Sequence, residues 1–196
     1  MMTDIVGTTH LTVVNARFNR DMVWSLGIVT ALDLLLKNYP EQEMAKKMSS
    51  SLFQCVDIDE AAVRAEADIM KSWAAGQTVE GVSAAMRGEG DSPLASIAAA
   101  AKDDEYWMYS RFFGIGLVAI MDDIGAASSA DDVYPLMEEW VSKSLGKSHF
   151  TACVSIDKRE MFHNYDLLLT SFFLVYNSLT VTHTSRSRRS LILWRQ

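Results

Sequence analysis

The sequence predicts an all-α protein, a single antiparallel bundle of about seven or eight helices. Apolar residues recur at helical spacing in successive segments, whereas the alternation typical of half-buried strands is almost absent. Residues that favour helix starts and helix ends stand at the boundaries of these segments. The connections between them are short, as expected where antiparallel helices pack as neighbours.

The first two expected helices meet at Pro40. Asn19 or Asp21 caps the first helix, which ends before Pro40 because the residue preceding a proline avoids the helical region. Pro40 suits the first turn of the second helix, where its missing N–H costs nothing. Asp57, with Glu60 three residues later, has the spacing of a capping box and predicts the start of a third helix.

Further helices are expected between Thr78 and Ile124. Thr78 caps a short helix that ends at Gly88, and Ser92 caps the next one. The acids Asp103, Asp104 and Glu105 favour the start of the next helix, at Tyr106 to about Ile124. This helix is expected to be the central one, because it is the most apolar. The predicted core residues of this helix and the first are Trp24, Ile28, Leu32, Phe112, Ile115, Leu117 and Ile120.

Two more helices complete the prediction. Asp131 or Asp132 caps a helix that ends at Gly146, and a last helix covers residues 154–178. A strand over Leu11–Val14 is the strongest competing assignment, but one strand alone forms no sheet. The expected organisation is an N-terminal extension at 1–19, a helical domain at 20–178 and a basic C-terminal tail at 179–196.

The net charge of −7 is unevenly distributed. The tail carries Arg186, Arg188, Arg189 and Arg195 and no acid, so it contributes +4, and the first 178 residues contribute −11. An acidic body argues against binding along a nucleic-acid backbone, which needs a basic face. The tail is interpreted either as a solvated terminus or, with Trp194 beside its arginines, as a contact with anionic lipid or a partner protein.

Titratable residues give no pattern of a catalytic centre, and no cofactor is predicted. Cys55 and Cys153 are too few for a disulfide framework and are expected to be reduced and buried. His163 shares a helix face with Glu160 and Asp166, a pattern that is far more often exposed charge than a metal site.

Two aspartate pairs and one glycine pair also receive structural interpretations. Asp122–Asp123 and Asp131–Asp132 lack the third acid of a magnesium-binding motif and are interpreted as helix-end residues. Gly114 and Gly116 lie in the most apolar segment without the third glycine of a dinucleotide fingerprint, which indicates close helix packing.

Two sequence motifs resemble a known family. The stretch at 20–33, RDMVWSLGIVTALD, contains Leu26 and Gly27 and is followed by KNYP at 37–40. The stretch YSRFFGIGL at 109–117 contains Tyr109, Ser110, Arg111 and Gly116. Both resemble motifs of the Thylakoid Formation family, also called the photosystem II biogenesis protein family, and the resemblance covers about residues 20–170. The first twenty residues and the C-terminal end do not match it.

This resemblance implies an all-helical protein without catalytic activity that acts in photosystem II biogenesis and repair. Implied partners are photosystem subunits, the FtsH-type protease and the thylakoid membrane surface. The implied location is the plastid, peripherally on the stromal face of the thylakoid, and the tail residues Arg186, Arg188, Arg189 and Trp194 are candidates for contact there. Two alternatives remain open: a permanent peripheral subunit of a photosystem I or II antenna supercomplex, and a metal-dependent helical enzyme.

The motif residues can serve structure or partner binding. Arg111 is the only base between Asp103 and Asp132, so we expect it to pair with a neighbouring carboxylate or helix end. Contact with a partner protein is the alternative role for this side chain.

Overall fold

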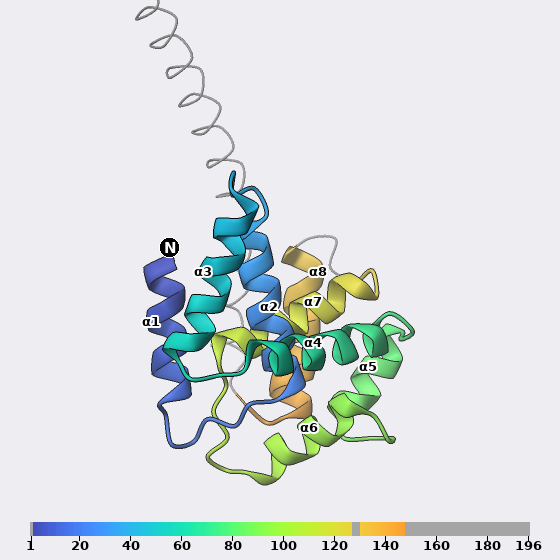
Figure 1. Ribbon diagram of the computed structural model, residues 1–196. Helices are drawn as coiled ribbons and strands as arrows, with labels where there is room; N and C mark the ends of the chain where they lie inside the picture. The colour runs from blue at the N-terminus through green and yellow to red at the C-terminus, as the bar shows by residue number, and fades with distance from the viewer. Residues whose placement is uncertain (1, 127–129, 148–196) are drawn as a thin grey trace, which may run out of the picture.

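The computed structural model describes residues 2–126 and 130–147, and this part of the chain contains helices and no strand (Figure 1). The predicted all-α class is confirmed. The last expected helix at 154–178, His163, Cys153 and the basic tail lie outside the described residues. The elements are α1 (Met2–Val13), α2 (Met22–Leu36), α3 (Gln42–Cys55), α4 (Glu60–Ala74), α5 (Val79–Met86), α6 (Pro93–Asp103), α7 (Arg111–Asp123), α8 (Ala130–Met137) and the π-helix η1 (Glu138–Ser144).

The centre of the fold is the pair α2 and α7, against which α4 also packs. All seven predicted core residues are buried, with at most 2% of their surface exposed. Their side chains contribute to two apolar clusters. One cluster joins the central pair to α4, α5, α6, α8 and η1, and the other joins it to α1, α3 and α4. Figure 1 shows α1 and α3 side by side on one flank, with α5 and α6 on the opposite flank.

Several predicted helix boundaries are confirmed by their caps. The Asp21 carboxylate accepts a hydrogen bond from the backbone N–H of Trp24 at 2.8 Å and caps α2. Thr78 caps α5 and Ser92 caps α6 through equivalent bonds, each satisfying an N–H that the first helical turn leaves unpaired.

Two starts in the first half of the chain differ from the prediction. α3 begins at Gln42, two residues after Pro40, which lies outside the helix. α4 is capped by Asp59, whose side chain accepts a hydrogen bond from the Ala61 N–H at 2.9 Å. Asp57 instead adopts a positive φ of 55° in the turn, so the expected capping box does not form.

The central helix is shorter than predicted. α7 begins at Arg111 because the Ser110 hydroxyl accepts a hydrogen bond from the Phe113 N–H at 3.1 Å. The preceding Trp107 and Tyr109 form a connection that packs its rings against Phe113. Tyr106 therefore lies outside the helix that it was expected to start.

The helix after residue 129 also departs from the prediction. It begins at Ala130, so Asp131 and Asp132 are in its first turn and neither is its cap. Pro135 removes one backbone donor within α8, and from Glu138 the chain continues as a π-helix. The buried Trp140 of this π-helix donates its indole N–H to Ser83 Oγ at 2.8 Å and so fixes η1 against α5.

The N-terminal segment forms α1, so the strand assignment over Leu11–Val14 is wrong. Thr9 donates its hydroxyl hydrogen to the Ile5 carbonyl at 2.8 Å, and Thr12 bonds the Thr8 carbonyl in the same way. These bonds along the helix satisfy the hydroxyls of residues that usually favour strands. Ile5 is 2% exposed and belongs to the core cluster that contains Trp24. Packing therefore overrides β propensity in this segment.

Candidate functional site

The two sequence motifs meet where α2 crosses α7. A Cβ atom added to Gly27 would overlap the carbonyl oxygen of Phe112 and lie 2.8 Å from the Gly116 nitrogen. A Cβ atom added to Gly116 would overlap the carbonyl oxygen of Val23. The expectation of close helix packing is therefore confirmed at Gly116. Leu26, beside Gly27, is 3% exposed and packs in the core.

The other motif residues fix the start of α7. Tyr109 is half-buried, and its ring lies 5.8 Å from that of Phe113 and 6.2 Å from that of Trp107. Ser110 is the buried cap of the helix. Arg111 Nη1 donates to the hydroxyl oxygen of Thr8 at 3.3 Å, which links α7 to α1. Arg111 therefore contacts a neighbouring helix, and the group that it binds in this contact is the side-chain hydroxyl of Thr8.

A polar cluster anchors the start of α2 on α4. Glu66 accepts hydrogen bonds from Arg20 Nη2 at 2.8 Å and from the Ser25 hydroxyl at 2.5 Å. Beside it, burial raises the pKa of Asp21 to about 6, against the effect of the backbone hydrogen bonds from Trp24 and Val23. The nearby Glu66 carboxylate adds to the rise. The α2 cap therefore carries a carboxylate that is costly to ionise.

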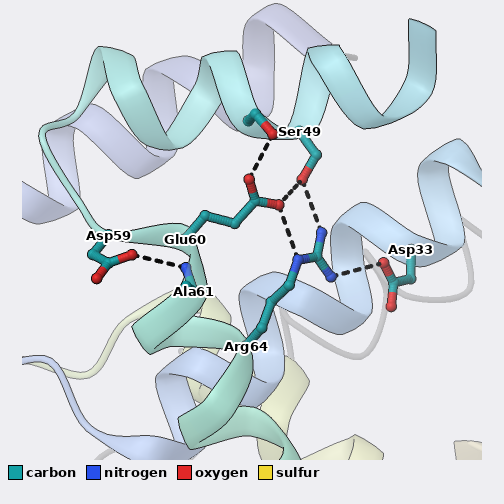
Figure 2. A network of polar contacts seen from close by, with 7 residues as sticks. Asp33, Ser49, Asp59, Glu60, Ala61 and Arg64 are labelled. Carbon is teal, nitrogen blue, oxygen red and sulfur yellow. Dashed lines mark hydrogen bonds and ion pairs between the residues drawn. The ribbon is translucent and has the colours of Figure 1, made fainter. Parts of the chain in front are cut away.

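A second network joins three helices, as Figure 2 shows. Glu60 of α4 accepts hydrogen bonds from the hydroxyls of Ser49 at 3.1 Å and Ser50 at 2.7 Å, both on α3. Arg64 Nε also donates to Glu60, at 2.9 Å, and Arg64 Nη1 lies 3.7 Å from Asp33 Oδ1 on α2. Burial acts to raise the pKa of Glu60, but the hydrogen bonds from Ser50, Arg64 and Ser49 bring it below its ordinary value.

Sequence reasoning did not identify this network. Its one sequence signal is the spacing of Glu60 and Arg64, which places opposite charges one turn apart on a helix. Ser49 lies on another helix, and no periodic pattern relates it to Glu60. The network holds α2, α3 and α4 together, and its groups satisfy one another.

An open apolar groove of about 270 Å³ lies on α3 beside α1. We call it the α1–α3 groove and define it by its lining residues, which are Val6, Met44, Lys47, Met48, Ser51, Leu52 and Cys55. Cys55 is a free, exposed thiol, so the expectation that it is buried is wrong.

Residues 2–126 and 130–147 contain no group of three or more His, Cys, Asp or Glu side chains arranged to hold a metal ion. Within the same ranges, no helix has the length and apolar character needed to cross a bilayer. The aspartates at 122–123 end α7. The candidate contact residues Arg186, Arg188, Arg189 and Trp194 are not among the residues that the structure describes.

The fold and the motif crossing define an all-helical protein built around one glycine-mediated helix pair. The sequence model of the family described as "Thylakoid formation protein" matches residues 1–161. The chain belongs to this family. The match begins at residue 1, so it includes the N-terminal segment in which sequence reasoning found no resemblance.

Curated relatives come from plants and cyanobacteria. "Protein THYLAKOID FORMATION 1, chloroplastic" of Arabidopsis thaliana is 28% identical over 124 residues, which are 62% of this chain and 41% of that protein. "Protein Thf1" of Rippkaea orientalis is 30% identical over 122 residues, or 60% of this chain and 52% of the relative. The matched region is about half the length of these relatives.

A solved structure titled "Structure of Psb29 at 1.55A" has the same fold. The TM-score is 0.69 at 16% sequence identity, and the match covers 84% of each chain. At 16% sequence identity, this structural likeness establishes the fold alone.

Proposed function

We propose that this protein is a non-catalytic accessory factor of the thylakoid that acts in photosystem II biogenesis and repair. The observation that carries the proposal is the family match over residues 1–161, which includes both motifs of the α2–α7 crossing. The names of the relatives, thylakoid formation proteins and Psb29, support the same assignment.

The positions of the motif residues support a binding role built on a rigid scaffold. Four motif residues have structural roles, because they pack in the core or cap a helix: Leu26, Gly27, Ser110 and Gly116. We therefore expect partners to bind the exposed surfaces around the helix pair. Function in such a scaffold depends on side chains that the rigid elements present to solvent. The proposed partners are photosystem subunits and the FtsH-type protease.

We place the protein on the stromal face of the thylakoid as a peripheral component. The basic tail at 179–196 supports this proposed location, because Arg188 and Arg189 are close in sequence to Trp194. Basic residues beside an apolar ring favour an anionic membrane interface, where each arginine adds about 1 kcal/mol of attraction.

Affinity purification of the tagged chain from thylakoids, with quantification of every copurifying subunit, tests the role. An accessory factor should recover photosystem II subunits or the protease in amounts well below one per tagged chain. Recovery of one photosystem at a fixed ratio near unity would instead identify a permanent subunit. Recovery of neither photosystem subunits nor protease, from intact tagged protein, would contradict the proposal.

Membrane washing tests the location. High salt should release the protein from isolated thylakoids, because exposed charge–charge attraction is screened by salt. The Arg188→Ser/Arg189→Ser variant should be released at lower salt than the parent chain. A matched variant, Lys37→Ser/Lys71→Ser, removes the same charge from the exposed body of the fold and should behave like the parent. Equal release of both variants would contradict attachment through the tail.

A further inference from the structure

The α1–α3 groove has the character of a site for apolar side chains. Met44, Met48 and Cys55 are spaced four and seven residues apart, which places them along one side of α3. Methionine is unbranched and adapts its shape to whatever packs against it. Val6 contributes from α1, and Met44 is 42% exposed in the uncovered groove.

The groove is less suited to a small polar ligand. Its volume of about 270 Å³ lies below the range of roughly 300–1,000 Å³ that is typical of such pockets. Lys47 and Ser51 are the polar residues of its lining, so it lacks a convergent set of hydrogen-bonding groups. An open apolar furrow along a helix is the kind of surface that receives another segment of polypeptide.

The same chain contains a segment of matching chemistry. Residues 167–176, LLLTSFFLVY, include no charged side chain, and eight of the ten are apolar. A run of this length is about half of the ~20 residues that a membrane-spanning helix needs. Burial against protein removes such a surface from water, which is favourable in proportion to its apolar area.

The chain is long enough to bring this segment to the groove. Nineteen residues, 148–166, separate the run from Lys147, the last residue described. Nineteen residues can extend over roughly 60 Å. A compact body of this length has a radius of gyration of about 15 Å, so every face lies within reach.

The charge of Lys47 at the rim of the α1–α3 groove is compatible with residues 167–176 as the segment that binds there. Lys46 pairs with Glu43 at 3.0 Å, whereas the structure records no ion pair for Lys47 within the described ranges. Asp166 immediately precedes the apolar run and would bring a carboxylate to this lysine. We infer that the α1–α3 groove is the docking site of residues 167–176 of the same chain.

The reactivity of the Cys55 thiol tests the inference on the full-length chain. In a Cys153→Ser background, Cys55 is the one remaining cysteine, and its alkylation by a maleimide reports whether the groove is covered. The Phe172→Asp/Phe173→Asp substitution should raise the alkylation rate by about tenfold, as expected if the groove is covered in nine of ten molecules. A matched substitution in the other apolar patch, Leu191→Asp/Leu193→Asp, should leave the rate unchanged.

Three outcomes would overturn the inference. Equal rates for the parent and both variants would show that residues 167–176 do not cover the groove. A faster rate only in the Leu191/Leu193 variant would assign the groove to the end of the tail. Protection that increases with protein concentration would assign it to a second copy of the chain.

Cross-linking decides the matter if the aspartate variants fail to fold. In the Cys153→Ser background, Phe172→Cys should form an intramolecular disulfide with Cys55 under mild oxidation, giving a monomer without free thiol. The control Leu191→Cys should keep both thiols. A disulfide that forms only between two chains, or none with Phe172→Cys, would refute docking within one chain.

Discussion

The close approach of α2 and α7 makes Gly27→Ala the sharpest test of the fold. The added methyl group would overlap the Phe112 carbonyl oxygen and lie 2.7 Å from its carbon. Carbon atoms pack favourably at about 3.5–4.0 Å, so relief of the carbon contact alone requires the two helices to separate by roughly 1 Å, and relief of the oxygen overlap requires more. The obstacle is backbone, which cannot rotate out of the way as a side chain can.

The expected cost is large against the stability of a domain. Inserting atoms into a packed core costs typically about 1–3 kcal/mol, and the backbone clash places this site at the upper end or beyond. Part of this cost is offset, because alanine has a higher helix propensity than glycine and stabilises a helix by about 1 kcal/mol. We therefore expect Gly27→Ala to lower the free energy of unfolding by about 2–3 kcal/mol, out of a typical 5–15 kcal/mol.

Urea unfolding followed by circular dichroism measures this change. The control is Gly7→Ala on α1, where an added Cβ meets no atom within 4 Å, so we expect stabilisation of up to about 1 kcal/mol. Gly27→Ala combined with Gly116→Ala should cost less than the sum of the single changes, because one separation of the helices relieves both clashes. A Gly27→Ala variant as stable as the control would refute the assigned helix contact.

Three further predictions concern polar residues. Because burial raises the pKa of Asp21 to about 6 from 3.8, the stability that this group contributes is full below pH 4 and is lost as pH rises through 6. Asp21→Asn, which keeps a capping side chain, should therefore gain up to about 3 kcal/mol relative to the parent between pH 4 and pH 7 in urea titrations; a pH-independent difference would contradict the shift. Arg64→Ala should destabilise the protein by about 1–2 kcal/mol at pH 7 and by less once the pH falls through the lowered pKa of Glu60, because a protonated Glu60 no longer forms an ion pair with Arg64; a loss that stays the same across an acid titration would show that charge does not explain it. Ser110→Ala should lower the melting temperature through a loss of about 1 kcal/mol, whereas an unchanged value would show that α7 does not depend on this cap.

Local rules in the sequence predicted much of the fold. Thr78 and Ser92 were assigned as caps, and Asn19 or Asp21 as the cap of the first helix, because a short polar side chain precedes an apolar periodic segment. Thr78 and Ser92 cap their helices, and of the first pair Asp21 is the cap. The seven core residues followed from the wide apolar faces of two segments. These signals are local, since each depends on residues within one or two turns.

Errors arose where several signals competed or where the decisive contact is distant in sequence. Asp57 and Asp59 both suit an N-cap, and the turn geometry at Asp57 decides in favour of Asp59. The acids before residue 106 suggested an early helix start, but the Ser110 cap places it later. Packing of Ile5 on the core makes residues 2–13 helical despite their threonines, and no local rule predicts that contact.

The positions of the motif residues bear on where function resides. Sequence motifs such as Leu26-Gly27 and Tyr109-Ser110-Arg111 are candidates for partner contact. In the structure, however, these residues pack in the core, cap a helix or link two helices. A glycine at this crossing lets the two helix backbones approach closely, so packing alone is a sufficient reason for Gly27 and Gly116. Partner recognition in this protein is then to be sought on the exposed surfaces of the fold, and variants that change exposed side chains there should alter binding without altering stability.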